Sequence, residues 1–447
     1  MLIITIKLVY NLIVDFTPDK IVERVKEYLP SKEVLLRYKK LNEDDIKLRQ
    51  QYQLDSPGAD LCVTSYSGRL LLVPPWHVLN RTPKDIKGID YARSVFEGSS
   101  FIPQLDKIDP KKIVSGNIVL HGPRMKRLHS SLLALGYDVP TDKIAQAVYD
   151  LALILGEKVM RTSAGLPSRA YIRPRGTVGK NGWGVAARAN DPVELGAIMF
   201  NWAFYFEDPI RIYQGTGLKA LIFLDAQRLS PIVGKLSANY PIVGGVGKKA
   251  KDMGYDEAIL LAPHGYNPKT KKREYVLAQE GKAALKKIEA GQDFADGPGE
   301  GIIAVVTKGD KKELWYPPES VNQLKSTTMA YVVEHLAPNI GFKVIEKPFG
   351  FYELKKNLID NVIMVGNAVG LAPVGEIGVV HPTHGMSQKI KMPITAATKM
   401  LVKQYQSELD GLTKPSHQSL LTPVDIHSED AIKARSIVYD AFANYYV

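Results

Sequence analysis

The stretch SPIVGKLSANYPIVGGVGKKAKDMGYDEAILL, residues 230 to 261, decides the fold. Within it Lys235, flanked by small residues, stands at the end of a predicted loop that precedes a predicted helix at 240–253 and a predicted strand at 257–262. A lysine amine can form a Schiff base with an aldehyde, and it does so best where burial lowers its pKa. Taken alone, a lysine is far more often a solvated surface group. Whether Lys235 is a reactive lysine therefore depends on the pattern of the surrounding residues.

Length and composition bound the class of protein. The chain has 447 residues, which predicts two folded domains plus extensions. Its hydrophobic fraction of 45% and charged fraction of 23% are typical of a globular protein. Cys62 is the only cysteine, which excludes an intramolecular disulfide and a secreted, disulfide-stapled scaffold. We therefore expect a cytoplasmic protein.

The net charge of +11 does not by itself indicate a nucleic-acid partner. The lysines are dispersed and mixed with acids, as in KKLNEDDIK at 39–47, and interleaved charges of this kind are typical of solvated faces. No nucleic-acid-binding motif has its required spacing, and no His/Cys/Asp/Glu cluster has metal-ligand spacing. We expect neither nucleic acid nor metal, but a positive field favours anionic ligands such as phosphates and oxo acids.

The first 16 residues, MLIITIKLVYNLIVDF, are apolar enough to raise the question of a membrane or signal segment. Lys7 and Asn11 interrupt the run, it is shorter than the roughly 20 residues that span a bilayer, and no small-residue cleavage site follows. We expect no membrane association and interpret the run as a packed strand or helix of an N-terminal extension.

The pattern of apolar runs and charged helices predicts an α+β / α/β chain of two domains. Apolar runs at 69–73 and 194–202 predict strands, and the stretches at 125–136 and 143–160 predict helices. Further along, strands are predicted at 219–224, 257–262, 301–307 and 361–366, with helices at about 240–253, 325–337 and 388–404, and one helix over the last 18 residues. The expected organisation is an N-terminal extension (1–64), a small α/β domain (65–205), a linker (206–217), a large domain (218–405) with a charged surface insertion (267–292), and a C-terminal extension (406–447).

The run around Lys235 resembles class IV pyridoxal-phosphate-dependent aminotransferases, in which a lysine, small residues, Asn and Tyr precede a helix ending in GYDE. Seven further segments resemble the same family in the same order, and the resemblance covers roughly residues 66 to 400. They are YARSVFEGSSF (91–101), RMKRLHSSLLALG (124–136), RAYIRPRG (169–176), FNWAFYF (200–206), ADGPGEGIIAVV (295–306), NQLKSTTMAYVVEHLA (322–337) and MVGNAVGLAPV (364–374). The branched-chain amino acid aminotransferases are the closest subfamily, because other branches do not share the Tyr-Ile-Arg-Pro arrangement at 171–174. The resemblance implies fold type IV, with a small N-terminal α/β domain and a larger domain with a mixed, barrel-like sheet, in a homodimer.

The resemblance also implies how the cofactor, pyridoxal 5′-phosphate, is held. Lys235 would be the Schiff-base lysine, with Tyr240 beside it in the cofactor site. Asp296 would pair with the pyridine nitrogen, where the family usually has Glu; Glu280 is a rival that lacks the second glycine and the following strand. The phosphate would be held by an arginine, a helix start and a turn, at Arg127, Thr327, Thr328 and Asn367. The family's Pro and Gly before that helix are Lys325 and Ser326 here, and its Thr in that turn is Asn367.

The substrate residues follow in the same way. Tyr171 would hold the α-carboxylate, and Arg173 would meet the distal carboxylate of glutamate or 2-oxoglutarate. The pocket and its turn would be completed by Tyr91, Phe96, Trp202, Tyr205 and Ala368. The expected activity is ping-pong transamination between branched-chain L-amino acids and 2-oxoglutarate. The alternatives are another class IV reaction, namely D-amino acid or amine transamination or aminodeoxychorismate cleavage, and a cofactor-binding protein with little turnover.

Overall fold

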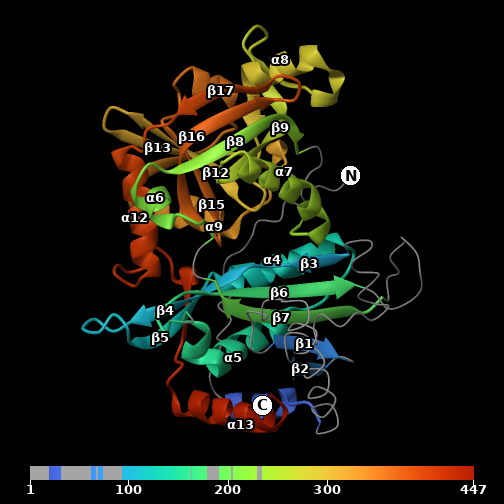
Figure 1. The fold of residues 1–447 in the computed structure, drawn as a ribbon, viewed down its shortest axis with the longest axis vertical. Helices are drawn as coiled ribbons and strands as arrows, with labels where there is room; N and C mark the ends of the chain where they lie inside the picture. The colour runs from blue at the N-terminus through green and yellow to red at the C-terminus, as the bar shows by residue number, and fades with distance from the viewer. Residues whose placement is uncertain are drawn as a thin grey trace. The chain divides into compact units, whose positions relative to one another are not determined.

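The computed structural model describes residues 20–31, 62–66, 69–73, 93–162, 164–178, 191–202, 205–228 and 234–446 (Figure 1). The chain divides into two compact units. Unit 1 is assembled from Met1–Ile86, Glu97–Asn201 and Ser419–Val447, and unit 2 from Lys87–Phe96 and Trp202–Gln418. Residues 406–447, taken from the sequence as one extension, are therefore divided between the two units.

Unit 1 contains an antiparallel sheet with the strand order β18-β5-β4-β6-β7-β1-β2. Its strands are β1 (Cys62–Tyr66), β2 (Arg69–Val73), β4 (Ser99–Leu105), β5 (Ile113–Val119), β6 (Ala170–Val178), β7 (Val193–Asn201) and β18 (Leu421–Val424). The strands predicted at 69–73 and 194–202 are confirmed. Strand β18 reaches this sheet from the far end of the sequence and pairs with β5.

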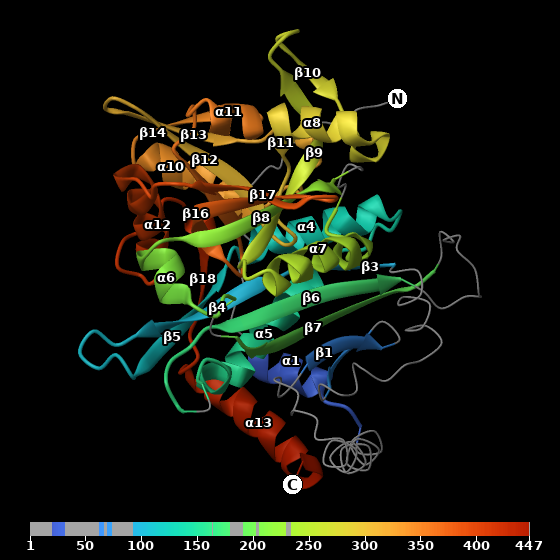
Figure 2. The ribbon, with the colours of Figure 1, turned by 45° about the horizontal axis from the view of Figure 1, so that its top comes forward.

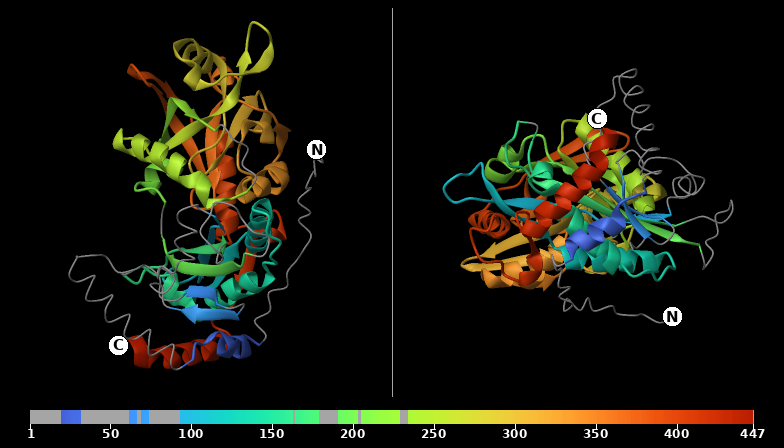
Figure 3. Two further views of the ribbon diagram at one scale, coloured as in Figure 1. Left: turned by 90° about the vertical axis from the view of Figure 1, so that its right-hand side faces the viewer. Right: turned by 90° about the horizontal axis from the view of Figure 1, so that it is seen from below.

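Helices α4 (His121–Ala134) and α5 (Asp142–Val159) belong to this unit and confirm the two helices predicted there. Helix α5 is apolar on nearly every side, and such a helix has to be covered on more than one face. The further cover comes from α1 (Ile21–Tyr28) and α13 (Glu429–Tyr446), which contact each other, and α13 also packs on α5 (Figure 3). The single C-terminal helix predicted from the sequence is confirmed, with 18 residues.

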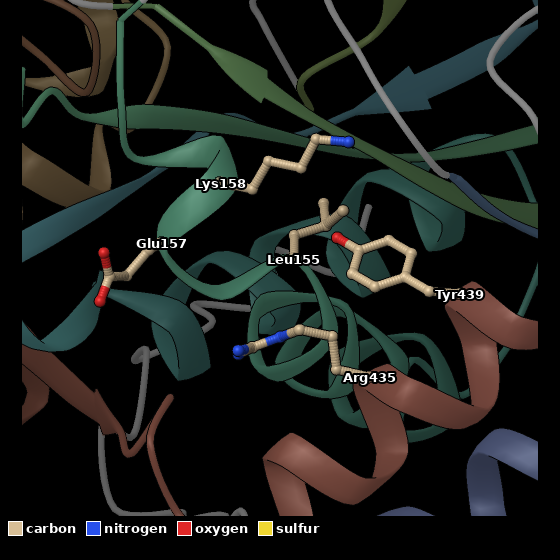
Figure 4. A pocket seen from close by; sticks show the side chains of 5 residues that line it. All are labelled: Leu155, Glu157, Lys158, Arg435 and Tyr439. Atoms are coloured by element: carbon tan, nitrogen blue, oxygen red, sulfur yellow. The ribbon is translucent and has the colours of Figure 1, made fainter. Parts of the chain in front are cut away.

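A break in α5 adjoins the cavity beside α13 (Figure 4). Gly156 has φ 51°, a left-handed value that glycine adopts most readily. Its backbone is therefore not helical, and α5 is kinked at this residue. Arg435 of α13 donates from Nε to the carbonyl oxygen of Ile154 and from Nη2 to that of Leu153, each at 3.0 Å. The cavity of about 420 Å³ is lined by Leu155, Glu157, Lys158, Arg435 and Tyr439. Its arginine is thus engaged in capping the broken helix.

Unit 2 contains a ten-stranded mixed sheet with the path β10-β9-β8-β16-β15-β12-β13-β14, while β11 pairs with β9 and β17 with β16. Its strands are β8 (Leu218–Gln227), β9 (Glu257–Asn267), β10 (Lys272–Tyr275), β11 (Gln292–Phe294), β12 (Gly301–Lys308), β13 (Lys311–Tyr316), β14 (Phe342–Glu346), β15 (Asn361–Gly366), β16 (Gly370–His381) and β17 (Gly385–Lys391). Parallel pairs join β8 to β9, β8 to β16 and β13 to β14, and the other pairs are antiparallel. The four strands predicted for this part of the chain, and its mixed sheet, are confirmed.

The helices of unit 2 are α6 (Pro209–Gln214), α7 (Tyr240–Asp252), α8 (Lys282–Gly291), α11 (Phe351–Lys355), α12 (Ala396–Leu409) and a run formed by α9 (Thr327–Tyr331), the π-helical turn η5 (Val332–Leu336) and α10 (Ala337–Asn339). The charged stretch 267–292 contains both the hairpin strand β10 and helix α8 (Figure 2). One face of α8 is not a surface feature, since Leu285 and Ile288 join the hydrophobic core of the unit.

The helix predicted at 388–404 is wrong in its first part. Residues up to Lys391 belong to β17, and the helix begins only at Ala396 with Thr395 as its N-cap. The physical reason is Pro393, which cannot donate a backbone hydrogen bond and favours an extended residue before it. Strand β17 pairs with β16, and its lysines are exposed to solvent.

The contact of α1 with α5 supplies a test of what holds unit 1 together. Arg24 donates from Nε and Nη2 to the two carboxylate oxygens of Asp150, each at 2.7 Å, and Asp150 is fully buried. Replacing Arg24 with Met would leave that buried charge without its cation, so we expect a loss of about 3 to 5 kcal/mol in the free energy of unfolding measured with urea. Arg161→Met, which breaks the more exposed pair with Glu157, is the control and should lose about 1 kcal/mol. Equal losses in the two variants would contradict this account.

Candidate active site

Lys235 is buried in unit 2 between two aromatic rings. Its Nζ lies 4.8 Å from the ring centroid of Phe96 and 4.9 Å from that of Tyr240, and it donates to the Tyr240 hydroxyl at 2.5 Å. The lysine is 9% exposed. Backbone pairing holds it there, because the Phe96 amide donates to the Lys235 carbonyl at 3.2 Å and the next residue, Leu236, forms a bridge with Val95. The amine predicted from the sequence is thus buried and fixed in position.

Asp296 lies near this lysine and is paired with an arginine. Arg228 donates from Nε to Oδ1 at 2.8 Å and from Nη2 to Oδ2 at 3.2 Å. Asp296 is 2% exposed, and burial raises the pKa of its carboxyl to about 6, against the opposing effects of Arg228 and of the charge on Lys235. The carboxylate expected at a pyridine nitrogen therefore already has a strong partner in the protein.

Glu300, four residues after Asp296 in the same turn, forms a second acidic group together with Glu257 of β9. Glu300 and Glu257 are buried, and the Tyr205 hydroxyl donates to Glu257 Oε2 at 3.0 Å. Burial, together with the charge of Glu257, raises the pKa of Glu300 to about 8, and burial raises the pKa of Glu257. The pKa of Tyr205 is raised by the charge of Glu300 and by burial. Tyr205, expected as a pocket residue, uses its hydroxyl inside this acidic cluster.

The turn that carries Asp296 and Glu300 is bordered by the two other predicted cofactor segments. A Cβ added at Gly366, where the turn with Asn367 and Ala368 begins, would lie 3.6 Å from Glu300 Cγ. A Cβ added at Gly301 would lie 2.9 Å from Gln323 Nε2 and 3.6 Å from Ser326 Cβ. Ser326 caps the helix that begins with Thr327 and Thr328, accepting a hydrogen bond from the Met329 amide at 3.2 Å. Both segments therefore meet at the start of β12.

Gln323 is a polar group in this region that the sequence reasoning missed. It is 6% exposed, and in the described part of the chain neither its Nε2 nor its Oε1 has a hydrogen-bond partner. A buried amide without partners is unfavourable by about 1 to 3 kcal/mol, so such groups in folded proteins usually face a ligand or water.

Unit 1 brings Tyr171 and Arg173 together on one face of β6. They are two residues apart, so their side chains share a face of the strand. The Arg173 guanidinium carbon lies 5.3 Å from the Tyr171 ring centroid, and the Phe200 ring on β7 lies 5.6 Å from the same ring. Gly98 lies directly beneath, since an added Cβ would overlap the Tyr171 hydroxyl oxygen. The glycine of the FEG motif is needed for that close approach.

Arg127 has a protein partner in the same unit. It donates from Nε to Glu97 Oε1 at 2.7 Å and from Nη2 to Glu97 Oε2 at 2.6 Å, and Glu97 is fully buried. The Glu97 amide in turn donates to the Pro174 carbonyl at 2.8 Å. Arg127 thus holds the loop that carries Gly98, against which Tyr171 packs, and its predicted role at a cofactor phosphate stays a prediction.

The predicted site residues fall into two groups. Lys235, Tyr240, Phe96, Asp296, Trp202, Tyr205, Thr327, Thr328, Asn367 and Ala368 belong to unit 2, while Arg127, Tyr171 and Arg173 belong to unit 1. The Trp202 ring lies 5.8 Å from that of Tyr205. Tyr91 lies outside the described residues. None of Arg228, Glu97, Glu257 and Glu300 was predicted as a site residue. Glu97, Glu257 and Glu300 lie inside the quoted segments YARSVFEGSSF, GYDE and ADGPGEG, whereas Arg228 lies outside every quoted segment.

Two classes of feature are not found in the described residues. No group of three or more His, Cys, Asp or Glu side chains there is arranged to hold a metal ion. Within the same ranges, no helix combines the length and the hydropathy that crossing a bilayer requires.

The model of the class IV amino-transferase family matches residues 112–377. Among curated relatives, the branched-chain-amino-acid aminotransferase of Escherichia coli strain K12 is 26% identical over 295 residues, covering 65% of this chain and 77% of the relative. Among solved structures, the branched-chain aminotransferase of Thermoproteus uzoniensis, in complex with norvaline, has a TM-score of 0.59 at 20% identity, covering 82% of this chain and all of the other. The branched-chain amino acid aminotransferase of Thermobaculum terrenum, in its PLP-form, has a TM-score of 0.55 at 18% identity, covering 83% of this chain and 99% of the other.

The acidic cluster predicts a pH dependence of stability. The folded pKa of Glu300, about 8, lies above its ordinary value of 4.5, so the folded state binds the proton more tightly than the unfolded state. Stability should be greatest below pH 4.5 as far as this group is concerned, fall as the pH rises, and level off above about 8. Glu300→Gln, a neutral isostere, should flatten this slope in urea unfolding measured across the range. An unchanged slope in the variant would show that the pKa of Glu300 does not differ between the folded and unfolded states.

Proposed function

The chain belongs to the class IV aminotransferases, and on that premise we propose that it moves an amino group between branched-chain L-amino acids and 2-oxoglutarate, with pyridoxal 5′-phosphate as cofactor. The observation that carries the proposal is the buried amine of Lys235, fixed 2.5 Å from the Tyr240 hydroxyl in the same unit as the buried carboxylate of Asp296. A transaminase of this class needs a lysine nucleophile and an acid for the ring nitrogen.

The residues of unit 2 fit such a cofactor. Lys235 offers an amine for an aldehyde, and Asp296 offers a carboxylate for a ring nitrogen. On the phosphate side, Ser326 caps a helix start, and the amide of Gln323 is buried without a partner among the described residues. Helix starts and amide donors suit a phosphate or another polar group of a ligand. Lys235, Tyr240, Asp296, Thr327, Thr328 and Asn367 would hold the group.

When bound, pyridoxal phosphate supplies an aldehyde that accepts amines and a ring that withdraws electrons from the substrate. Lys235 Nζ, once displaced by the substrate amine, would act as the base that takes the proton from the substrate α-carbon. The Tyr240 hydroxyl would orient that lysine amine, since it accepts its hydrogen bond at 2.5 Å. The flanking rings of Phe96 and Tyr240 would exclude water from it.

The choice of branched-chain substrates rests on two sets of side chains, together with the names of the similar proteins. Phe96 and Trp202 would offer apolar area, and each buried substrate methylene contributes about 0.8 kcal/mol. Arg173 would meet the side-chain carboxylate of the oxo-acid partner, since an unpaired carboxylate is strongly disfavoured in a desolvated pocket. Tyr171, next to Arg173, would hold the α-carboxylate, and Tyr205 and Ala368 would complete the pocket. The E. coli relative is a branched-chain-amino-acid aminotransferase, and the Thermobaculum terrenum neighbour was solved in its PLP-form.

Two further parts of the proposal concern the whole protein. The family resemblance implies a homodimer, and the single cysteine favours a reducing compartment, which we take to be the cytoplasm. Sedimentation of the purified chain and cell fractionation test these two points.

Lys235→Ala is expected to abolish both transamination and the visible absorbance of lysine-bound cofactor. Borohydride reduction of the wild-type holoenzyme followed by peptide mapping should place the phosphopyridoxyl group on Lys235. The matched control is Lys248→Ala, which removes an exposed lysine of α7 and should change neither property. A phosphopyridoxyl group mapped to another lysine would refute the assignment of Lys235 as the Schiff-base lysine.

Arg173→Met is expected to raise KM for 2-oxoglutarate by about tenfold or more, because a charged hydrogen bond is lost, while KM for leucine changes little. Arg161→Met, which removes the arginine paired with Glu157 near the end of α5, is the control and should spare both substrates. Equal losses for both substrates in Arg173→Met, or activity restricted to D-amino acids or aminodeoxychorismate, would refute the branched-chain assignment and leave the class IV family standing.

A further inference from the structure

Arg228 is an unassigned residue whose side chain and backbone are both fixed next to Asp296. It directly follows β8, and its amide donates to the Leu261 carbonyl at 2.8 Å. Its own carbonyl accepts a hydrogen bond from Asn322 Nδ2 at 2.7 Å. The guanidinium forms a two-point contact with the Asp296 carboxylate, and Nη2 also approaches the Gly297 carbonyl at 3.4 Å.

We propose that Arg228 is a positioning residue of the cofactor site, which holds the Asp296 carboxylate in one orientation and in its ionised form for the nitrogen of a pyridine ring. This inference rests on the proposed function, because it assigns the pyridine nitrogen to Asp296. A planar guanidinium that binds through two nitrogens fixes the plane of a carboxylate and also stabilises its ionised form. A single point charge, such as an ammonium group, would stabilise the ionised form without fixing the plane.

The charges that face Asp296 show why the arginine matters. Burial favours the neutral form of Asp296, and the charge of Asp296 in turn raises the pKa of Glu300. Arg228, Lys235 and the Leu324 amide favour the ionised form, and Arg228 is the strongest of these three. Lys235 is also the group that would react with the cofactor's aldehyde, so its effect on Asp296 would change on loading, whereas the two-point contact of Arg228 does not involve a reacting group.

A purely structural role is the alternative, and the chain offers a matched pair that has one. Arg273 donates to Asp293 at 2.7 and 3.0 Å, Asp293 is fully buried, and burial raises its pKa to about 6. This pair also binds Glu353 and lies beside Tyr266, among residues that carry no predicted cofactor role. Removing either arginine should therefore disturb a buried aspartate, but only Arg228 should affect ligand binding.

The test measures the proton on Asp296 first in the cofactor-free full-length chain. In the wild type, the infrared band of a protonated carboxyl assigned to Asp296 should disappear as the pH rises through about 6. In Arg228→Met burial is unopposed by the guanidinium, so the band should persist at neutral pH. It should be absent from the double variant Arg228→Met/Asp296→Asn. Arg228→Gln, which keeps one donor, is the second variant in case the first folds poorly.

The second measurement is binding of pyridoxamine 5′-phosphate, which cannot form a bond to Lys235. Calorimetry in buffers of different ionisation heat gives the number of protons taken up. Because Arg228→Met already carries the proton on Asp296 at neutral pH, it should take up about one proton fewer than the wild type on binding. Arg273→Met should match the wild type in proton uptake, and Arg228→Lys should restore most of it.

The outcomes separate the two proposals. Ionised Asp296 at neutral pH in folded Arg228→Met or Arg228→Gln, or proton uptake equal to that of the wild type, would overturn the positioning role. Variants of Arg228 that unfold at every pH would assign the pair to folding and overturn it too. A wild-type chain that shows the infrared step but binds no pyridoxamine phosphate would instead refute the proposed function.

Discussion

A carboxylate that is removed from water has to be matched by a cation or give up its charge, and the centre of unit 2 depends on this constraint. The turn between β11 and β12 places two acids in the core, and the protein treats them differently. Asp296 receives an arginine, which opposes the effect of burial on its pKa. Glu300 faces another acid and a tyrosine, and its pKa rises further. One short turn therefore carries a candidate anion and a candidate neutral acid side by side.

The candidate site residues of the two units differ in what determines their properties. Unit 2 holds the candidate nucleophile and the buried acids, whose properties depend on burial. Unit 1 presents Tyr171 and Arg173 on a regular strand, where spacing by two places both side chains on one face. The ion pair of Arg127 with Glu97 supports these strand residues, because it fixes the loop at Gly98 against which Tyr171 packs. A rigid strand positions these groups more accurately than a loop could.

The parts of the structure that follow from local pattern could be predicted from the sequence. Helix α5 has an apolar pattern over its whole length, and Lys235 and Tyr240, five residues apart, meet within one loop and helix start. The pairs that depend on the fold could not: Arg228 and Asp296 are 68 residues apart, and nothing near Arg228 marks it. Strand β17 was missed because its residues 388–391 were joined to the helical pattern that follows them, whereas their pairing with β16 selects the extended form.

The discontinuous composition of unit 1 has a consequence for synthesis on the ribosome. Strand β18 and helix α13 follow the whole of unit 2 in the sequence, yet they complete the sheet and the cover of α5. During synthesis, more than two hundred residues are added after α5 before α13 is made and can cover the apolar side of α5. Unit 2, continuous apart from one short segment, can mature during that interval. The nascent form of unit 1 is therefore the stage at which a holdase chaperone would find exposed apolar surface.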